Sequence, residues 1–169
     1  MDYITEISIV VLLTIITWQD FTTREISVLL FPAVTILLIY HAMKYADVEQ
    51  LFLNFSFNIG FLTAQLFMLF YYLRLRYGKN PGMFSNYFGW GDVLLLASVC
   101  MLFSLYGFML FIITSSLVSL VVALAYGWMK KKKMQQIPFA AVAALVFLVF
   151  WFTNLVSYPE EIFDTYALR

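Results

Sequence analysis

The sequence predicts an all-α, polytopic membrane protein of about six transmembrane helices. Hydrophobic residues make up 63% of the 169 residues, charged residues make up only 12%, and the mean hydropathy is +0.88. A soluble domain is closer to half apolar and a quarter charged. A globular fold of this size could not bury so much apolar surface, so membrane lipid must be the solvent for much of it. Residues 1–169 are expected to form a single membrane-embedded domain.

Charged residues mark the ends of the first three predicted helices. The apolar segments run over about residues 3–18, 26–43 and 51–73. Pro32 lies within the second segment, where we expect a kink that a membrane helix tolerates. The N-terminal flank of the first segment is acidic and no small-residue cleavage site follows it. The first segment is therefore expected to be a retained helix and not a signal peptide.

The second half of the chain is predicted to form three more helices. Residues 93–129 carry no formal charge, but one helix of that length would extend about 55 Å, nearly twice the hydrocarbon core. Two helices are therefore expected, with the chain reversing at residues 104–107. A lysine run at residues 130–133 ends the fifth helix, and the sixth is expected over about residues 137–156.

The distribution of basic residues predicts the orientation, since cytoplasmic loops are enriched in Lys and Arg. The loops after the first, third and fifth helices share one side and hold eight of the ten basic residues. These are Arg24, Arg74, Arg76, Lys79 and the four lysines at 130–133. The other side has only Lys44 and Arg169. The first side is therefore expected to be cytoplasmic, with both termini outside.

Composition also excludes several kinds of site. The formal net charge is zero, so no basic face for nucleic acid is expected. Cys100 is the only cysteine, which excludes an intramolecular disulfide and a zinc cluster built on cysteines. Neither a metal nor a cofactor is expected.

Two aspartates lie at the edges of apolar segments, Asp20 after the first and Asp92 at the start of the fourth. Carboxylates at membrane depth usually face a helix bundle and mark function, although an aspartate at a helix start can also be an N-cap. Two carboxylates in one desolvated cleft share a proton. One can then activate water against a peptide carbonyl while the other protonates the carbonyl oxygen and the leaving amine. Such a pair requires the first and fourth helices to be neighbours.

Gly89 and Gly91 flank Trp90 directly before Asp92. Without Cβ atoms, the two glycines permit unusual backbone angles. They also permit the close approach of a substrate chain to Asp92.

Three short motifs follow one another along the chain. In the first, Asp20 is followed six residues later by Ile26, with Arg24 between them. The second and third are Gly89-Trp90-Gly91-Asp92-Val93 and, after the lysine run, Ile137-Pro138-Phe139-Ala140. In order and spacing they resemble the motifs of the type IV prepilin and preflagellin peptidases, membrane aspartyl peptidases of the Gly-x-Gly-Asp type. The resemblance covers essentially the whole chain.

The resemblance implies a multi-pass aspartyl endopeptidase of the cytoplasmic (inner) membrane. Such an enzyme cleaves short leader peptides from pilin-like precursor proteins at the cytoplasmic face, in a type IV pilus or protein-secretion system. The resemblance also implies the site residues. They are Asp20 and Asp92 as the catalytic pair, with Gly89, Gly91, Arg24, Ile26 and Pro138 supporting the motifs or the substrate.

The sequence departs from the family motifs at several positions. Ser27 and Val28 stand where the family usually has Pro-Asn, and Leu94 stands where Lys is common. These changes leave both carboxylates in place and are expected to affect the substrate groove. The Cys pairs of the methyltransferase segment found in larger members do not occur, so the minimal, peptidase-only form is expected.

Two other functions stay open for the aspartates. A non-catalytic membrane scaffold, or a degenerate homologue from a pilus or secretion assembly system, would have the same helices without cleavage. A small transporter could relay protons through the two carboxylates. Transporters more often show inverted repeats and polar residues within their helices, and neither is seen in this sequence.

Overall fold

The part of the chain that the structure describes is built only from helices. The computed structural model describes residues 2–78, 89–130 and 138–157. Within these ranges the chain forms six α-helices and one 3-10 helix, η2, without a strand. The predicted all-α class and six-helix organisation are therefore confirmed.

The first helix extends past the aspartate that was expected to follow it. α1 (Asp2–Thr22) includes Asp20 in its last turn. The helix is closed by the main-chain carbonyl of Gln19, which accepts N–H groups from Thr23 (2.9 Å) and Arg24 (3.2 Å). Arg24 adopts a left-handed conformation with φ 60°. The charged side chain thus marks the edge of the apolar segment and not the end of the helix.

The second helix starts later than the sequence predicts. α2 (Leu30–Ala42) begins close to Pro32. Pro32 therefore lies in the first turn, where its missing N–H leaves no intrahelical hydrogen bond unmade. It marks a helix start and not the kink that was expected. α3 (Val48–Tyr77) has 30 residues and ends at Gly78, whose φ of 86° suits a residue without a Cβ.

The uncharged stretch after Asp92 forms two helices, as predicted. α4 (Trp90–Val99) continues into η2 (Cys100–Leu102), and α5 (Leu105–Lys130) follows the reversal. Ser104 caps α5, because its hydroxyl accepts the N–H of Gly107 at 3.2 Å. The reversal therefore lies within the expected region.

A buried amide from α3 completes this reversal. Nδ2 of Asn58 donates to the carbonyls of Cys100 (2.7 Å) and Phe103 (2.6 Å). Carbonyls at the end of a helix lack partners within it. Asn58 supplies those partners and ties the far end of α4 to the middle of α3.

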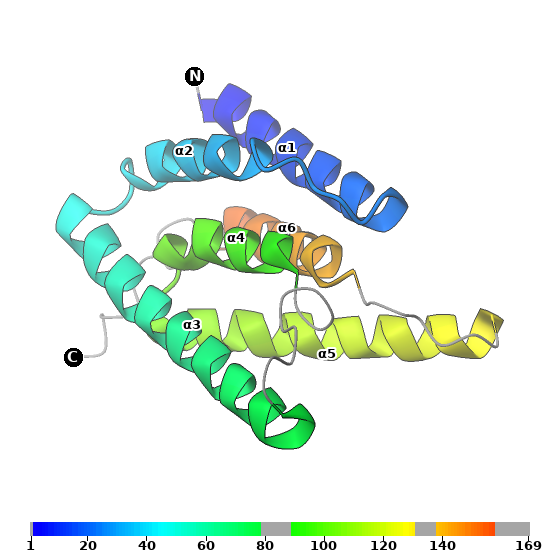
Figure 1. Cartoon of the computed structure of the whole chain (residues 1–169). Helices are drawn as coiled ribbons and strands as arrows, with labels where there is room; N and C mark the ends of the chain where they lie inside the picture. The colour runs from blue at the N-terminus through cyan, green and yellow to red at the C-terminus, as the bar shows by residue number, and fades with distance from the viewer. Residues whose placement is uncertain (1, 79–88, 131–137, 158–169) are drawn as a thin grey trace.

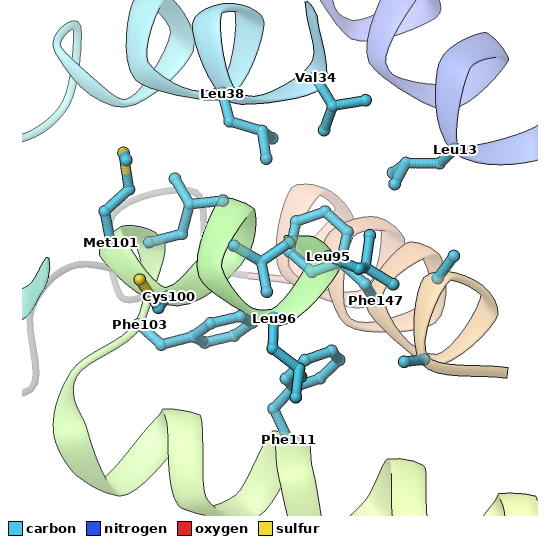
Figure 2. Close-up of a cluster of buried hydrophobic side chains, with 14 of the residues drawn as sticks. Leu13, Val34, Leu38, Leu95, Leu96, Cys100, Met101, Phe103, Phe111 and Phe147 are labelled. Atoms are coloured by element: carbon cyan, nitrogen blue, oxygen red, sulfur yellow. The ribbon is translucent and has the colours of Figure 1, made fainter. Parts of the chain in front are cut away.

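The sixth helix occupies a central position. α6 (Phe139–Ser157) packs against α1, α4 and α5. Its buried residues include Ala140, Ala143 and Ala144, and such small side chains let helices approach closely. Figure 2 shows apolar side chains from several helices converging on this region, among them Leu13, Val34, Leu38, Leu95, Leu96, Phe111 and Phe147.

The outside of the bundle is apolar. Three helices are long and apolar enough to cross a membrane, over Tyr3–Thr22, Val48–Tyr77 and Leu105–Ala125. Shorter apolar stretches occupy the other three, over Leu30–Ala42, Trp90–Leu102 and Phe139–Thr153. Large exposed side chains such as Phe67, Met68 and Val121 cover the long helices. Exposed apolar surface on this scale requires lipid around it, so the chain is a membrane protein.

One end of the bundle gathers the helix ends that carry the two aspartates. In Figure 1, α1, α3 and α5 end, and α2, α4 and α6 begin, on the same side. Arg74 and Arg76 lie in the last turn of α3 and so share this side with Asp20 and Asp92. Lys44 follows α2 at the opposite end. This arrangement agrees with the prediction that the loops after the first, third and fifth helices share one side and hold most of the basic residues. Lys79, Arg169 and the lysines at 131–133 lie outside the described residues.

Candidate active site

Asp20 reaches across the bundle to the start of α6. The backbone N–H of Ala141 donates a hydrogen bond to Oδ2 of Asp20 at 2.7 Å, between residues 121 positions apart. The first N–H groups of a helix have no partner within it, and the helix dipole favours a negative charge there. Asp20 is only 8% exposed. Its carboxylate is therefore held inside the bundle by a second helix.

Asp92 lies in the first turn of α4 and faces the same helix start. Its Oδ2 accepts the N–H of Gly89 at 2.9 Å, and its own N–H donates to the carbonyl of Gly89 at 3.2 Å. These two bonds form a reciprocal cap. The N–H of Ala140 also interacts with the Asp92 carboxylate. Successive N–H groups of α6, those of Ala140 and Ala141, thus serve the two carboxylates, one each.

The two aspartates are electrostatic neighbours, as the sequence predicts. Asp20 acts on Asp92 as a nearby like charge, and Arg24 acts on Asp20 as a nearby opposite charge. Two carboxylates held at one desolvated position favour a state in which they share a proton. Within the described ranges, no group of three or more His, Cys, Asp or Glu side chains is placed to hold a metal ion.

N-capping alone does not account for this arrangement. Asp92 does cap its own helix, α4. Asp20, in contrast, lies in the last turn of α1, where the helix dipole disfavours a negative charge. The N–H of Ala141 offsets part of this cost, and a buried carboxylate beside a second one in a membrane protein usually marks a functional site.

α1 and α4, which carry the two aspartates, are connected through other helices. The expectation that α1 and α4 are direct neighbours is wrong, because α1 packs mainly on α6 and α2, and α4 packs on α2 and α6. The N-terminus of α6 joins the two aspartates. The shared position of the pair therefore depends on a third helix that the positions of the aspartates in the sequence do not indicate.

The two glycines before Asp92 serve capping and packing. Gly89 has φ −76° and ψ 147°, an extended conformation open to any residue, and Gly91 has no positive φ. The prediction of unusual backbone angles is therefore wrong. A close approach does occur at Gly91, where a Cβ would lie 3.0 Å from Cδ1 of Ile26 and 3.7 Å from Cζ of Phe31. Gly91 thus lets the loop between α1 and α2 contact the start of α4.

Pro138 marks the start of α6. It is buried, and its carbonyl accepts the N–H of Val142 at 3.2 Å. Because the helix begins here, the N–H groups of Ala140 and Ala141 are available to the carboxylates. The sequence motifs singled out Pro138 but gave no role to Ala140 or Ala141, whose contribution comes from the main chain. The signal that could have found them is a proline directly before an apolar run, which is typical of a helix start.

Comparison with known proteins agrees with the motifs. The sequence profile of the type IV leader peptidase family matches residues 7–124. The matched residues include both aspartates, Asp20 and Asp92, whereas Pro138 and α6 lie beyond them. Neither curated proteins nor solved structures give a match to the chain.

Proposed function

This chain belongs to the type IV leader peptidase family and is thus a membrane protease, and on that premise we propose that it is an aspartyl endopeptidase whose catalytic pair is Asp20 and Asp92. One observation carries the proposal. Two carboxylates from different halves of the chain meet at the first N–H groups of α6. A pair that shares one proton there contains both the base and the acid that peptide hydrolysis needs.

The proposed chemistry is the attack of water on a peptide carbonyl. The ionised carboxylate takes a proton from water as the water oxygen bonds to the carbonyl carbon, and the protonated carboxylate donates to the carbonyl oxygen. The resulting diol collapses, the C–N bond breaks, and the amine leaves with a proton from the pair. Hydrogen bonds from Ala141 to Asp20 and from Gly89 to Asp92 orient the carboxylates for these steps.

The proposed substrates are pilin-like precursors, cleaved at the cytoplasmic face of the inner membrane. The carboxylates lie near the ends of their helices, so the scissile bond has to lie close to the membrane boundary. A leader peptide followed by an apolar helix meets this requirement, because the helix stays in the bilayer while the leader extends into the cytosol. Arg74 and Arg76 at the same end support the cytoplasmic orientation.

Cysteine labelling tests the orientation and the multi-pass topology. Cys100 is buried, so it contributes little to labelling by a membrane-impermeant thiol reagent. A cysteine introduced at Ser27 is expected to react only from the cytosol, and one at Asp47 only from outside. The opposite pattern would remove the cytoplasmic site.

Cleavage by the reconstituted protein tests the pair. Asp20→Asn and Asp92→Asn keep the side-chain shape and remove the shared proton, so each is expected to abolish cleavage of a pilin-like precursor. The double variant should lose little more, because residues that act as a unit are non-additive. Asp47→Asn is the matched control, since Asp47 makes no side-chain capping bond and lies at the opposite end of the bundle. Normal cleavage by Asp20→Asn refutes the pair.

A non-catalytic scaffold or degenerate homologue is the second candidate. The departures at Ser27, Val28 and Leu94 favour it, since they fall in the two aspartate motifs. Leu94 packs against the apolar core, in place of a lysine that would present a charge. A protein that binds precursors but cleaves none of a panel of leaders, with or without Asp92→Asn, would support this second function.

A further inference from the structure

Gln19 closes the loop that follows the first aspartate. Its side-chain Oε1 accepts the backbone N–H of Ser27 at 2.9 Å, eight residues along the chain. Its main-chain carbonyl accepts the N–H groups of Thr23 and Arg24. The two carbonyl groups of one residue therefore hold both the beginning and the end of residues 23–27 against the last turn of α1.

This loop contacts the other half of the site. Ile26 lies against Gly91, where an added Cβ would come within 3.0 Å of its Cδ1. Gly91 is the residue directly before Asp92. The loop thus links the end of α1, which carries Asp20, to the start of α4. This link is separate from the one made by α6.

The chemistry at position 27 explains why a side-chain restraint is needed. A proline there would restrict the loop through its ring and would have no N–H to donate. Serine leaves the main chain free to rotate and has an N–H group, which donates to Oε1 of Gln19 at 2.9 Å. The Gln19 amide supplies both the partner and the restraint.

We infer that Gln19 is a positioning residue of the catalytic pair. Its side chain holds residues 23–27 in place, and these residues fix the start of α4 relative to α1. The distance between the two carboxylates depends on that relation. The inference rests on the proposed function, because the carboxylates are the groups that Gln19 positions.

The first test is kinetic. Gln19→Leu is expected to lower kcat by about tenfold to a hundredfold, as a small misplacement of catalytic groups does, with KM changed less than about twofold. Thr14→Ala on the same helix removes an exposed hydroxyl that bonds only to the carbonyl of Val10, at 2.7 Å, and is the matched control, with kcat as in the wild type. Ser27→Pro in the Gln19→Leu background should restore kcat, because the proline ring restrains the loop in place of the lost hydrogen bond.

The second test is independent of catalysis. Hydrogen exchange at the Ser27 amide should be faster in Gln19→Leu than in the wild type or in Thr14→Ala, while the melting temperature stays close to that of the wild type. If the leucine variant does not fold, Gln19→Ser, too short to reach Ser27, makes the same test.

The outcomes separate this inference from the proposed function. Unchanged exchange at Ser27 overturns the positioning role alone. So does an unchanged kcat with faster exchange, or a double variant that is not rescued. A wild-type protein that cleaves no precursor overturns the proposed function and this inference with it.

Discussion

Replacing Asn58 should be among the most damaging changes away from the carboxylates. Its Nδ2 binds the carbonyls of Cys100 and Phe103 at 2.7 and 2.6 Å, and the side chain is 0% exposed. Asn58→Leu keeps a similar volume and removes the side-chain donor that both carbonyls have in Asn58. Each buried group that loses its partner costs about 1–3 kcal/mol, so the free energy of unfolding should fall by about 2–6 kcal/mol.

Two considerations place the expected fall in the free energy of unfolding in the lower half of this range. Oδ1 of Asn58 is buried without a hydrogen-bond partner, so its removal recovers part of a desolvation penalty already present. Hydrogen bonds between membrane helices also contribute less than their burial suggests, because the unfolded chain finds other partners in the bilayer. The expected loss is about 2–4 kcal/mol.

Unfolding in detergent, followed by tryptophan fluorescence, measures this loss. Ser56→Ala on the same helix is the matched control, because the Ser56 hydroxyl is exposed and bonds only within α3, to the carbonyl of Phe52 at 2.8 Å. It should change the free energy of unfolding by less than about 0.5 kcal/mol. Asn58→Asp, which replaces the donor by an acceptor, should be at least as destabilising as Asn58→Leu. An Asn58→Leu protein as stable as the control refutes the reasoning.

Further predictions concern the site itself. Gly91→Ala places a Cβ 3.0 Å from Cδ1 of Ile26 and should destabilise the fold by about 1 kcal/mol. Gly60→Ala, at an exposed helix position with nothing within 4 Å, should stabilise it by roughly 0.5–1 kcal/mol. If both variants change the free energy of unfolding in the same direction, the contact between Gly91 and Ile26 is contradicted. Ala141→Pro removes the N–H that binds Asp20 at a position in the first helical turn that tolerates proline, and should lower the cleavage rate by about tenfold to a hundredfold. Ala141→Gly keeps that N–H and should remain active, and a fully active proline variant would show that the bond is dispensable.

The shared end of Asp20 and Asp92 could be predicted because local chemistry determines it. Basic residues indicate which loops lie together, and the long uncharged stretch has to reverse once, near Ser104. Both signals can be read within a few residues of sequence. They place each aspartate at an end of its helix without any knowledge of packing.

The partner of the pair could not be predicted in this way. The contact of Asp20 with the N–H of Ala141 joins residues 121 positions apart; Pro138 indicates a helix start, but not which side chain the first N–H groups of that helix meet. The sequence predicts that Gly91 leaves space for a substrate chain, but Ile26 occupies the space beside it. Asn58 is one of several polar residues in α3, and only the fold shows that it meets two carbonyl groups. In each case the missing information is which helices pack together.

The lengths of α2 and α4 have a consequence for the bilayer. With the proposed multi-pass topology, the apolar stretches Leu30–Ala42 and Trp90–Leu102 each extend about 20 Å, about 10 Å less than the hydrocarbon core. The two helices pack together, so the shortfalls adjoin, and tilting would only increase them. Figure 1 shows α5 extending well past the start of α4 on the aspartate side. With that topology, we expect the hydrophobic mismatch there to thin the bilayer and to draw headgroups and water inward. For the proposed hydrolase, water is the second substrate, and we expect the short helices to bring it to the depth of the carboxylates.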